Sequence, residues 1–173
     1  WKGQHVVLDA IAQISGVHCI LVGEALFGED DYVRSLHERA RALGISERVH
    51  FLGFRRDVYQ LMQLSDIIVH SSIAPEPFGR VVVEGMLARR PVVATKTGGI
   101  LEIIDDNQTG ILVLPNDAGA LTKALISLLD NPNLAESLAK QGYTAAVKRF
   151  SMEAMLLKID KEIQEVYENS TSK

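Results

Sequence analysis

Short apolar runs alternate along the chain with segments whose apolar residues recur at helical spacing. The runs are rich in β-branched residues and are apolar on both faces, which is typical of strands in a parallel sheet covered by helices. The predicted strands are residues 17–22, 49–52, 67–69, 92–94 and 111–113. The helical stripes between and before them begin at Val6, Val33, Val58 and Val82.

The chain after residue 113 carries only helical patterns. Asn116 or Asp117 can cap a helix that runs to Asp130. A second helix is expected from Asn133, and a third from Ser151 with its apolar residues on one face. The closing segment, ENSTSK, is polar and is expected to be frayed.

This order of elements predicts an α/β fold, a doubly wound, Rossmann-like parallel sheet with extra C-terminal helices. In such a sheet a ligand binds outside the carboxyl ends of the strands. The loops that follow the strands are therefore the places to look for a site: residues 23–30, 53–56, 70–79, 95–99 and 114–117.

Composition narrows the class of protein. The chain has 173 residues, 47% of them hydrophobic, and a formal net charge of −4 with acidic and basic residues interleaved. These values indicate one globular domain and argue against a general binder of nucleic acid or membrane surfaces. Cys19, the one cysteine, is expected in the core, and its being single indicates a reducing compartment. A helical stripe begins almost at the first residue, so we expect further polypeptide upstream in a longer protein.

Residues 23–28, GEALFG, have the glycine spacing of a phosphate-binding loop. However, Glu29 and Asp30 follow where a P-loop requires Lys and Ser or Thr, and the segment does not match G-x-G-x-x-G. We therefore reject a P-loop and a dinucleotide site, and interpret the segment as a flexible turn from a strand to a helix.

Two other glycine turns are better candidates for an anion site. Pro77 and Gly79 break the chain before the helix of PFGRVVVEG, which exposes backbone N–H groups at the helix start. Gly98 and Gly99 follow the strand VVAT and allow the backbone to approach a ligand closely. Each pattern alone also fits an ordinary turn, but two of them on one edge of a sheet favour a binding site.

A carboxylate flanks the first of these turns on each side, Glu76 before it and Glu84 after it. A helix start contributes only ~0.3–1 kcal/mol to holding an anion at an exposed site, and two carboxylates would cancel this gain for a bare phosphate. The pattern fits a ligand that is anionic in the middle and carries diols at both ends, because a carboxylate accepts hydrogen bonds from hydroxyls. A nucleoside diphosphate sugar has this layout. The alternative is that both glutamates are solvated surface charges.

The stretch EPFGRVVVE resembles the Glu-x7-Glu motif of the retaining, GT-B fold glycosyltransferases of family 4, the glycosyl transferases group 1. Three other segments resemble motifs of that family in the same order: KG, VHFLGFRRDVYQLMQLSDIIVHSS and PVVATKTGGILEIIDDNQTGILVLPND. The resemblance covers nearly the whole chain and implies the C-terminal, donor-binding half of a GT-B fold. His70, which stands where the family often has Pro, is expected to be structural. The family's arginine before KG is absent.

The resemblance also implies roles for individual residues. Glu84 would accept hydrogen bonds from the ribose hydroxyls, and Glu76 from the hydroxyls of the donor sugar. Lys2 would act on the phosphates, so Glu76 and Lys2 are the catalytic candidates. The other candidates are Phe78, Gly79 and Arg80 against the sugar, Val81 and Val82 near the diphosphate, Phe54 and Arg55 beside the base, and Gly98 and Gly99 on the acceptor side.

The implied reaction transfers a sugar, with retention at the anomeric carbon, from a UDP-, GDP- or ADP-linked donor to an acceptor hydroxyl. The acceptor would be a sugar, a lipid-linked glycan or a small molecule in polysaccharide or glycoconjugate biosynthesis. No Asp-x-Asp pair or His/Cys cluster with ligand spacing occurs, so neither a metal nor another cofactor is expected. The alternatives are a nucleotide-sugar epimerase or hydrolase of the same fold, and a non-catalytic nucleotide-sugar-binding domain.

Residues 1–150 are expected to form the nucleotide-sugar-binding domain. Residues 151–173 would add a helix that either belongs to this domain or packs on a missing N-terminal half, in which case its apolar stripe is exposed here. GT-B enzymes close two domains over a cleft, so this chain alone is expected to bind nucleotide and to transfer nothing. A cytoplasmic protein is expected, with peripheral contact at the inner membrane through the N-terminal half and no nucleic-acid partner.

Overall fold

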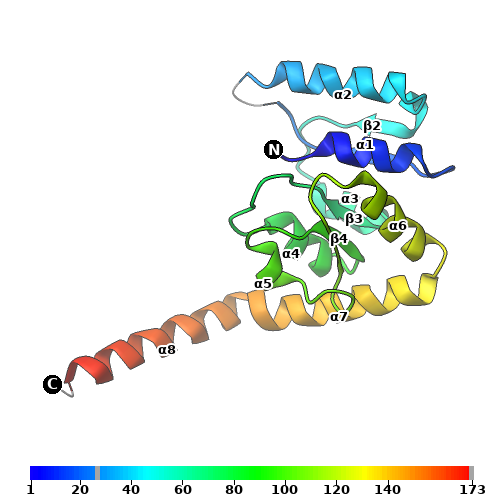
Figure 1. Ribbon diagram of the computed structural model, residues 1–173. Helices are drawn as coiled ribbons and strands as arrows, with labels where there is room; N and C mark the ends of the chain where they lie inside the picture. Colours follow the sequence, from blue (N-terminus) through cyan, green and yellow to red (C-terminus); the bar gives the residue numbers. More distant parts are fainter. Residues whose placement is uncertain (26–27, 172–173) are drawn as a thin grey trace.

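The structure, a computed structural model, describes the backbone of residues 1–25 and 28–171 and the side chains of residues 1–25 and 28–167. Strands and helices alternate along the first two thirds of these residues, and helices follow (Figure 1). The strands are β1 (Cys19–Leu21), β2 (Val49–Phe51), β3 (Ile68–His70), β4 (Val92–Thr95) and β5 (Ile111–Val113). The helices are α1 (Gln4–Ala12), α2 (Asp30–Ala42), η1 (Ser46–Arg48), α3 (Val58–Leu64), α4 (Arg80–Leu87), α5 (Ile100–Ile103), α6 (Ala118–Leu129), α7 (Pro132–Phe150) and α8 (Met152–Thr171).

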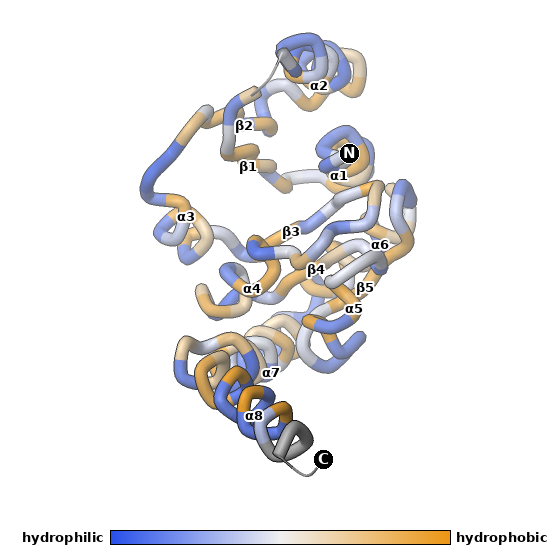
Figure 2. Tube along the Cα trace, turned by 90° about the vertical axis from the view of Figure 1, so that its left-hand side faces the viewer, coloured by the Kyte–Doolittle hydropathy of each residue, from blue (hydrophilic) through white to orange (hydrophobic). Residues whose placement is uncertain are grey.

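All five predicted strands are present and all their pairings are parallel, which confirms the α/β fold class. The first strand is shorter than the predicted 17–22. The strands form two separate hydrogen-bonded groups, β1–β2 and β3–β4–β5. Within the described part of the chain, no strand pairs with the edge of β1 that faces away from β2, or with the edge of β3 that faces away from β4. Figure 2 places β1, β2 and α2 on one side of the molecule and β3, β4 and β5 on the other, and Figure 1 agrees for α2, β2, β3 and β4.

One apolar core nevertheless joins the two strand groups. Cys19 and Val49 from the first group belong to the same buried cluster as Val93 and Val113 from the second. Helix α1 contributes the fully buried Leu8 to this cluster and packs against both α2 and α6. A second buried cluster lies between α4, α5 and β4, where α7 packs against α4. This packing fixes the loops at the carboxyl ends of β3 and β4 relative to each other.

Cys19 is buried, as predicted. Burial raises the pKa of its thiol to about 11, so the thiol stays protonated at neutral pH and acts as a small core side chain.

The C-terminal helices begin at capping side chains. The Asp117 carboxylate accepts a hydrogen bond from the Ala120 amide at 2.8 Å, which confirms it as the cap of α6. Helix α7 starts at Pro132 rather than at the predicted Asn133. The Asn131 side chain caps this helix by accepting from the Leu134 amide, and Pro suits the first helical position because its nitrogen carries no hydrogen.

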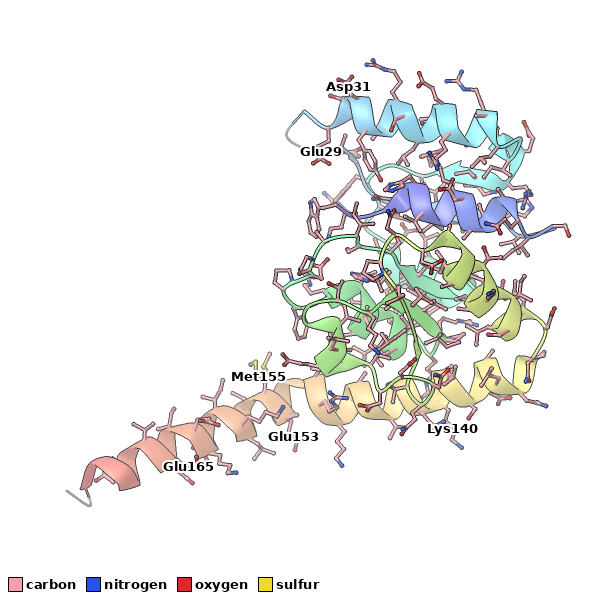
Figure 3. The ribbon with its side chains drawn as sticks, viewed as in Figure 1. Glu29, Asp31, Lys140, Glu153, Met155 and Glu165 are labelled. Atoms are coloured by element: carbon pink, nitrogen blue, oxygen red, sulfur yellow. The ribbon has the colours of Figure 1, made fainter. Side chains whose placement is uncertain are left out.

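As predicted, Ser151 stands at the start of helix α8, and the Ser151 hydroxyl accepts a hydrogen bond from the Ala154 amide. It projects away from the rest of the molecule (Figure 1), and side chains such as Met155, Glu153 and Glu165 point into solvent (Figure 3). The predicted exposure of its apolar face is confirmed for Met152, Met155, Leu156, Ile159, Ile163 and Val166.

Two sequence-based expectations fall partly outside the described residues. The backbone of α8 continues to Thr171, so the tail expected to fray from Glu168 is helical as far as that residue. Residues 172–173 of that tail lie outside the described residues. The turn interpreted in residues 23–28 includes 26–27, which also lie outside them.

Among the helices described, none combines the length and the apolar character needed to cross a membrane.

Candidate functional site

A cavity of about 410 Å³ lies where the loop after β3 meets the start of α4. This is the carboxyl edge of the parallel strands, where the sequence predicted a site. Both glutamates that frame the glycine turn line the same cavity. Its lining residues are Lys2, Glu76, Pro77, Phe78, Gly79, Arg80, Val81 and Glu84.

Three side chains donate hydrogen bonds to one carboxylate oxygen of Glu76. Lys2 Nζ lies 2.9 Å from Glu76 Oε2, Ser72 Oγ lies 3.2 Å from it and His70 Nε2 lies 3.4 Å from it. Burial acts to raise the pKa of Glu76, but the hydrogen bonds from Lys2, His70 and Ser72 outweigh it and hold the pKa below its ordinary value. Glu76 is therefore a carboxylate at neutral pH and only accepts hydrogen bonds.

His70 connects this carboxylate to the next strand. Its Nδ1 lies 3.3 Å from Thr95 Oγ1 on β4, and its ring is buried. Burial lowers the pKa of His70, although the neighbouring Glu76 acts in the opposite direction, so the ring is neutral at physiological pH.

The two glycine turns predicted from the sequence touch each other through their backbones. The Gly99 amide donates a hydrogen bond to the Glu76 carbonyl oxygen at 2.8 Å. Gly98 has a positive φ of 55°, and a Cβ at this position would overlap the backbone of Glu76. A Cβ at Gly99 would overlap the backbone at Pro77. Glycine is therefore required at both positions by close backbone approach.

Helix α4 begins directly after Gly79, which has a positive φ of 96°. Arg80 and Val81 occupy the first turn, where amides have no partner inside the helix and are free to hold an anion. The Val82 amide already donates to the Gly79 carbonyl oxygen at 3.0 Å, and the Val82 side chain is fully buried. The donors available to a diphosphate are thus the amides of Arg80 and Val81.

Glu84 lies one helical turn after Arg80 and forms an ion pair with it, in which Arg80 Nη2 lies 3.2 Å from Glu84 Oε1. The Arg80 side chain is exposed, so this pair adds little to stability and does not prevent Glu84 from accepting other hydrogen bonds.

Lys2 is held in place by its neighbours. The Trp1 carbonyl oxygen accepts from the Ile73 amide at 2.9 Å, and the Lys2 carbonyl oxygen accepts from the Ser71 hydroxyl at 3.0 Å. The ammonium of Lys2 lies 3.6 Å from the centre of the Trp1 ring and also reaches Glu76. These contacts bring Lys2 to the cavity at the end of β3.

Phe54 and Arg55 do not line this cavity. The Phe54 side chain is exposed, and Arg55 forms a two-point ion pair with Asp57 at 2.7 and 2.8 Å. The loop that carries them is tied to the loop after β1, where the Gly23 amide donates to the Gly53 carbonyl oxygen. The assignment of both residues to the base stays a prediction.

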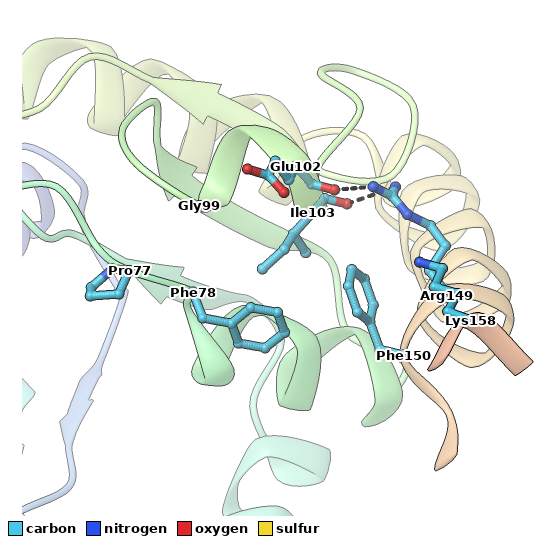
Figure 4. Close-up of a pocket in the computed structure, with 8 residues that line it drawn as sticks. All are labelled: Pro77, Phe78, Gly99, Glu102, Ile103, Arg149, Phe150 and Lys158. Carbon is cyan, nitrogen blue, oxygen red and sulfur yellow. Dashed lines mark hydrogen bonds between the residues drawn. The ribbon is translucent and has the colours of Figure 1, made fainter. Parts of the chain in front are cut away.

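A second cavity of about 370 Å³ shares Pro77 and Phe78 with the first and also contains Gly99 (Figure 4). Phe78 meets Phe150 of α7 edge to face, with ring centres 5.8 Å apart. Arg149 donates to the backbone oxygens of Glu102 and Ile103 and so holds α5 against the end of α7. The remaining lining residue is Lys158 of α8.

The sequence reading missed the hydrogen-bonding roles of Ser72 and Thr95 and assigned His70 only to structure. Their one sequence signal is position, because VHSS and VVAT end neighbouring parallel strands. Among the described residues, no group of three or more His, Cys, Asp or Glu side chains is arranged to hold a metal ion.

Comparisons with known proteins agree on one family. The model of the family described as glycosyl transferases group 1 matches residues 1–145. The lipopolysaccharide core biosynthesis glycosyltransferase LpsE of Rhizobium meliloti is 33% identical, over 89% of this chain and 44% of the relative. The putative glycosyltransferase EpsD of Bacillus subtilis is 36% identical, over 87% of this chain and 39% of the relative.

Solved structures give the same result. The crystal structure of Anabaena HepE in complex with UDP superposes with a TM-score of 0.89 and 42% identity, over 98% of this chain and 46% of that one. The HepE structure with UDP-glucose superposes with a TM-score of 0.88 at the same identity. The chain thus spans less than half the length of these relatives.

Proposed function

The chain belongs to the glycosyl transferases group 1 family, as the donor-binding part of a GT-B fold, and we propose that the whole protein is a retaining glycosyltransferase. It would move a sugar from a nucleoside diphosphate sugar to an acceptor hydroxyl. The observation that carries this proposal is that Glu76 and Glu84 line one cavity with the first amides of α4 between them.

This arrangement fits the three parts of a nucleotide sugar. The amides of Arg80 and Val81 point from a helix start, which favours the diphosphate. Glu84 lies one turn along α4 and would accept from the ribose diol. Glu76 would accept from the sugar hydroxyls, with Phe78 and Gly79 forming the wall beside the sugar.

Lys2 would assist departure of the nucleoside diphosphate. Its ammonium lies beside the carboxylate of Glu76 and within the same cavity. A positive charge and helix amides that face the developing phosphate charge lower the barrier electrostatically. Stabilisation of this kind needs no metal ion, and we propose a metal-independent reaction on that basis.

A UDP-sugar is the donor that we propose to test first, because HepE was crystallised with UDP and with UDP-glucose. Thermal-shift titrations of this chain with UDP-, GDP- and ADP-glucose test the proposal. A ligand at 100 times its Kd raises the unfolding free energy by about 2.7 kcal/mol through mass action. Glu84→Ala is expected to weaken the affinity for the nucleotide sugar about tenfold or more, since a hydrogen bond to a charged group is lost.

Glu38→Ala is the control, because Glu38 is also a glutamate on a helix, but it is exposed and belongs to α2. It should respond to the nucleotide sugar like the parent chain. An equal response of Glu84→Ala and the parent would contradict the ribose assignment, and no response of the parent to any nucleotide sugar would contradict the function.

We also propose that an acceptor half outside this chain completes the enzyme. The exposed apolar face of α8 supports this, since proteins normally cover such a face. The open edges of β1 and β3 lead us to propose also that a further strand outside this chain completes the sheet, because unpaired strand edges are normally covered. We propose that the whole protein acts in the cytoplasm, with any membrane contact made through that other half. The chain alone should bind the donor without transferring sugar.

Hydrogen exchange tests the open edges. The Leu21 carbonyl oxygen accepts from the Leu52 amide just after β2, and the Ile68 amide donates to the Pro91 carbonyl oxygen just before β4. Because neighbouring residues of a strand point to opposite edges, the amides of Ile20 and Val69 face the open edges. Their exchange should slow in a longer native polypeptide relative to this chain, while Leu21 and Ile68 change little. If the amides of Ile20 and Val69 exchange as fast in the longer polypeptide as in this chain, completion of the sheet is contradicted.

A further inference from the structure

We propose that His70 is a positioning residue that sets the orientation of the Glu76 carboxylate toward the donor sugar. This inference rests on the proposed function, in which Glu76 accepts hydrogen bonds from that sugar. The observation behind it is a row of three polar side chains, the buried Thr95 and His70 and the partly buried Glu76, that runs from β4 across the end of β3 into the cavity.

The strand pairing explains why the row forms. His70 ends β3 and lies in register with Ala94 of β4, next to Thr95. Thr95 is only 3% exposed and His70 only 5% exposed, so neither side chain can satisfy its hydrogen bonds with bulk water. Each must use the other, and His70 must use Glu76.

The chemistry of the three groups fixes the tautomer of His70. The Glu76 carboxylate only accepts, so the ring nitrogen facing it, Nε2, must carry the hydrogen. Nδ1 is then an acceptor, and the Thr95 hydroxyl, which can donate or accept, donates to it. The reverse tautomer would place the Nε2 lone pair against a carboxylate oxygen.

The consequence for the cavity lies in which oxygen is held. His70, Ser72 and Lys2 all contact Oε2 of Glu76. No described side chain donates to Oε1, which is left for a ligand hydroxyl. Lys2 comes from the exposed start of the chain, whereas Ser72 and His70 are both buried. His70 is in addition joined to the neighbouring strand β4 through Thr95.

The groups facing His70 are few, which makes its titration interpretable. Glu76 is the one charged side chain in hydrogen-bond contact with it, Lys2 lies behind that carboxylate, and Thr95 contributes a hydroxyl from β4. The neutral Nε2–H ring should persist across the physiological pH range.

Binding of two probes separates positioning from a merely structural role. UDP lacks the sugar that Glu76 would contact, and UDP-glucose has it. His70→Ala should weaken UDP-glucose about tenfold or more in calorimetric titrations, as for a lost hydrogen bond to a charged group, while UDP changes by less than about twofold. His70→Gln retains an N–H donor and should recover part of the affinity for UDP-glucose.

His18→Gln is the control, because His18 is exposed and its ring contacts His50, near the start of the β1–β2 pair, through a hydrogen bond and stacking. It should leave both affinities unchanged. A parent chain that binds neither probe would overturn the proposed function and this inference together. If the parent binds UDP-glucose and His70→Ala binds both probes as the parent does, the function stands and positioning is wrong.

If His70→Ala and His70→Gln each lose as much affinity for UDP as for UDP-glucose, the positioning role is also overturned, because such losses indicate a general structural defect. Nitrogen-15 spectra of the unliganded chain give a test that needs no ligand. They should show neutral His70 with its hydrogen on Nε2 at pH 7, and a ring protonated on Nδ1 would contradict the proposal.

Discussion

The Gly99 amide donates a hydrogen bond to the carbonyl oxygen of Glu76 at 2.8 Å, and so joins the loop after β4 to the loop after β3. Glu76 carries its carboxylate into the cavity from one of these loops, while Gly98 and Gly99 shape the other. Because the backbones touch, the conformation after β4 determines where the Glu76 side chain begins. Substitutions in the glycine pair should therefore change the shape of the cavity, although neither glycine lines it.

Gly98→Ala is expected to destabilise the fold by at least about 2 kcal/mol. The positive φ strains any other residue by roughly 1–2 kcal/mol, and the added methyl would also overlap the backbone of Glu76. The affinity for UDP-glucose should fall with it, because Glu76 must move. Chemical denaturation and calorimetric titration measure the two effects.

Gly44→Ala is the matched control for this substitution. Gly44 has a comparable φ of 68°, but a Cβ there would meet no heavy atom within 4 Å. It should show the backbone strain alone, with unchanged ligand affinity. If both variants lose the same stability, the contact between the two loops does not constrain the site as described.

The sequence located the strands well because a buried β-branched run is a local signal, as residues 92–94 and the observed Val92–Thr95 show. It misplaced the start of α7 because Asn131 and Asn133 are equally good caps by residue type, and only the folded backbone selects Asn131. The division of the strands into two groups was not predictable, since pairing depends on long-range contacts that periodicity does not contain.

The arrangement of the candidate site was predictable where the local sequence around one helix start decided the outcome. Glu76 and Glu84 frame a helix start, and their meeting in one cavity follows from that local geometry. The role of His70 was not predictable because its partner Thr95 comes from another strand. For Val82, the sequence indicates a place near the start of α4. It does not show that the Val82 amide already donates a hydrogen bond to the Gly79 carbonyl oxygen.

The stability that Glu76 contributes should depend on pH. Its pKa in the folded chain lies below the ordinary value of 4.5, so the carboxylate form is favoured by folding. The contribution is therefore present in full above about pH 4.5 and is lost as the pH falls through the folded-state pKa. The difference in unfolding free energy between the parent and Glu76→Gln should shrink below pH 4.5.

Glu47→Gln serves as the control for this series, because Glu47 is an exposed carboxylate away from the cavity. Its difference from the parent should stay small across the same range. A difference between parent and Glu76→Gln that is constant from pH 7 to about pH 3 would show that Lys2, Ser72 and His70 do not stabilise the charged form.

Asp117→Ala should destabilise the chain by about 1 kcal/mol, because it removes the acceptor for the Ala120 amide at the start of α6. Asp130 at the opposite end of the same helix provides the comparison. A carboxylate there faces the negative end of the helix dipole, so Asp130→Ala should be neutral or slightly stabilising. Equal losses for the two variants would mean that capping does not contribute at Asp117.

The exposed face of α8 gives the last prediction. Leu156 and Ile163 are 56% and 63% exposed, whereas Leu138 on the preceding helix is 2% exposed. Leu156→Glu and Ile163→Glu should each change the unfolding free energy of this chain by less than about 0.5 kcal/mol, because no packed surface is disturbed. Leu138→Glu should cost several kcal/mol, since it buries a charge.

The same two α8 variants should behave differently in a longer native polypeptide that includes the proposed acceptor half. There they are expected to lower stability by roughly 1–3 kcal/mol each, as for a large apolar side chain removed from a buried interface. Denaturation of both forms, monitored by circular dichroism, measures the contrast. Losses of equal size in the two forms would show that α8 packs within this chain, and the absence of any loss in the longer form would leave α8 without a role in joining the halves.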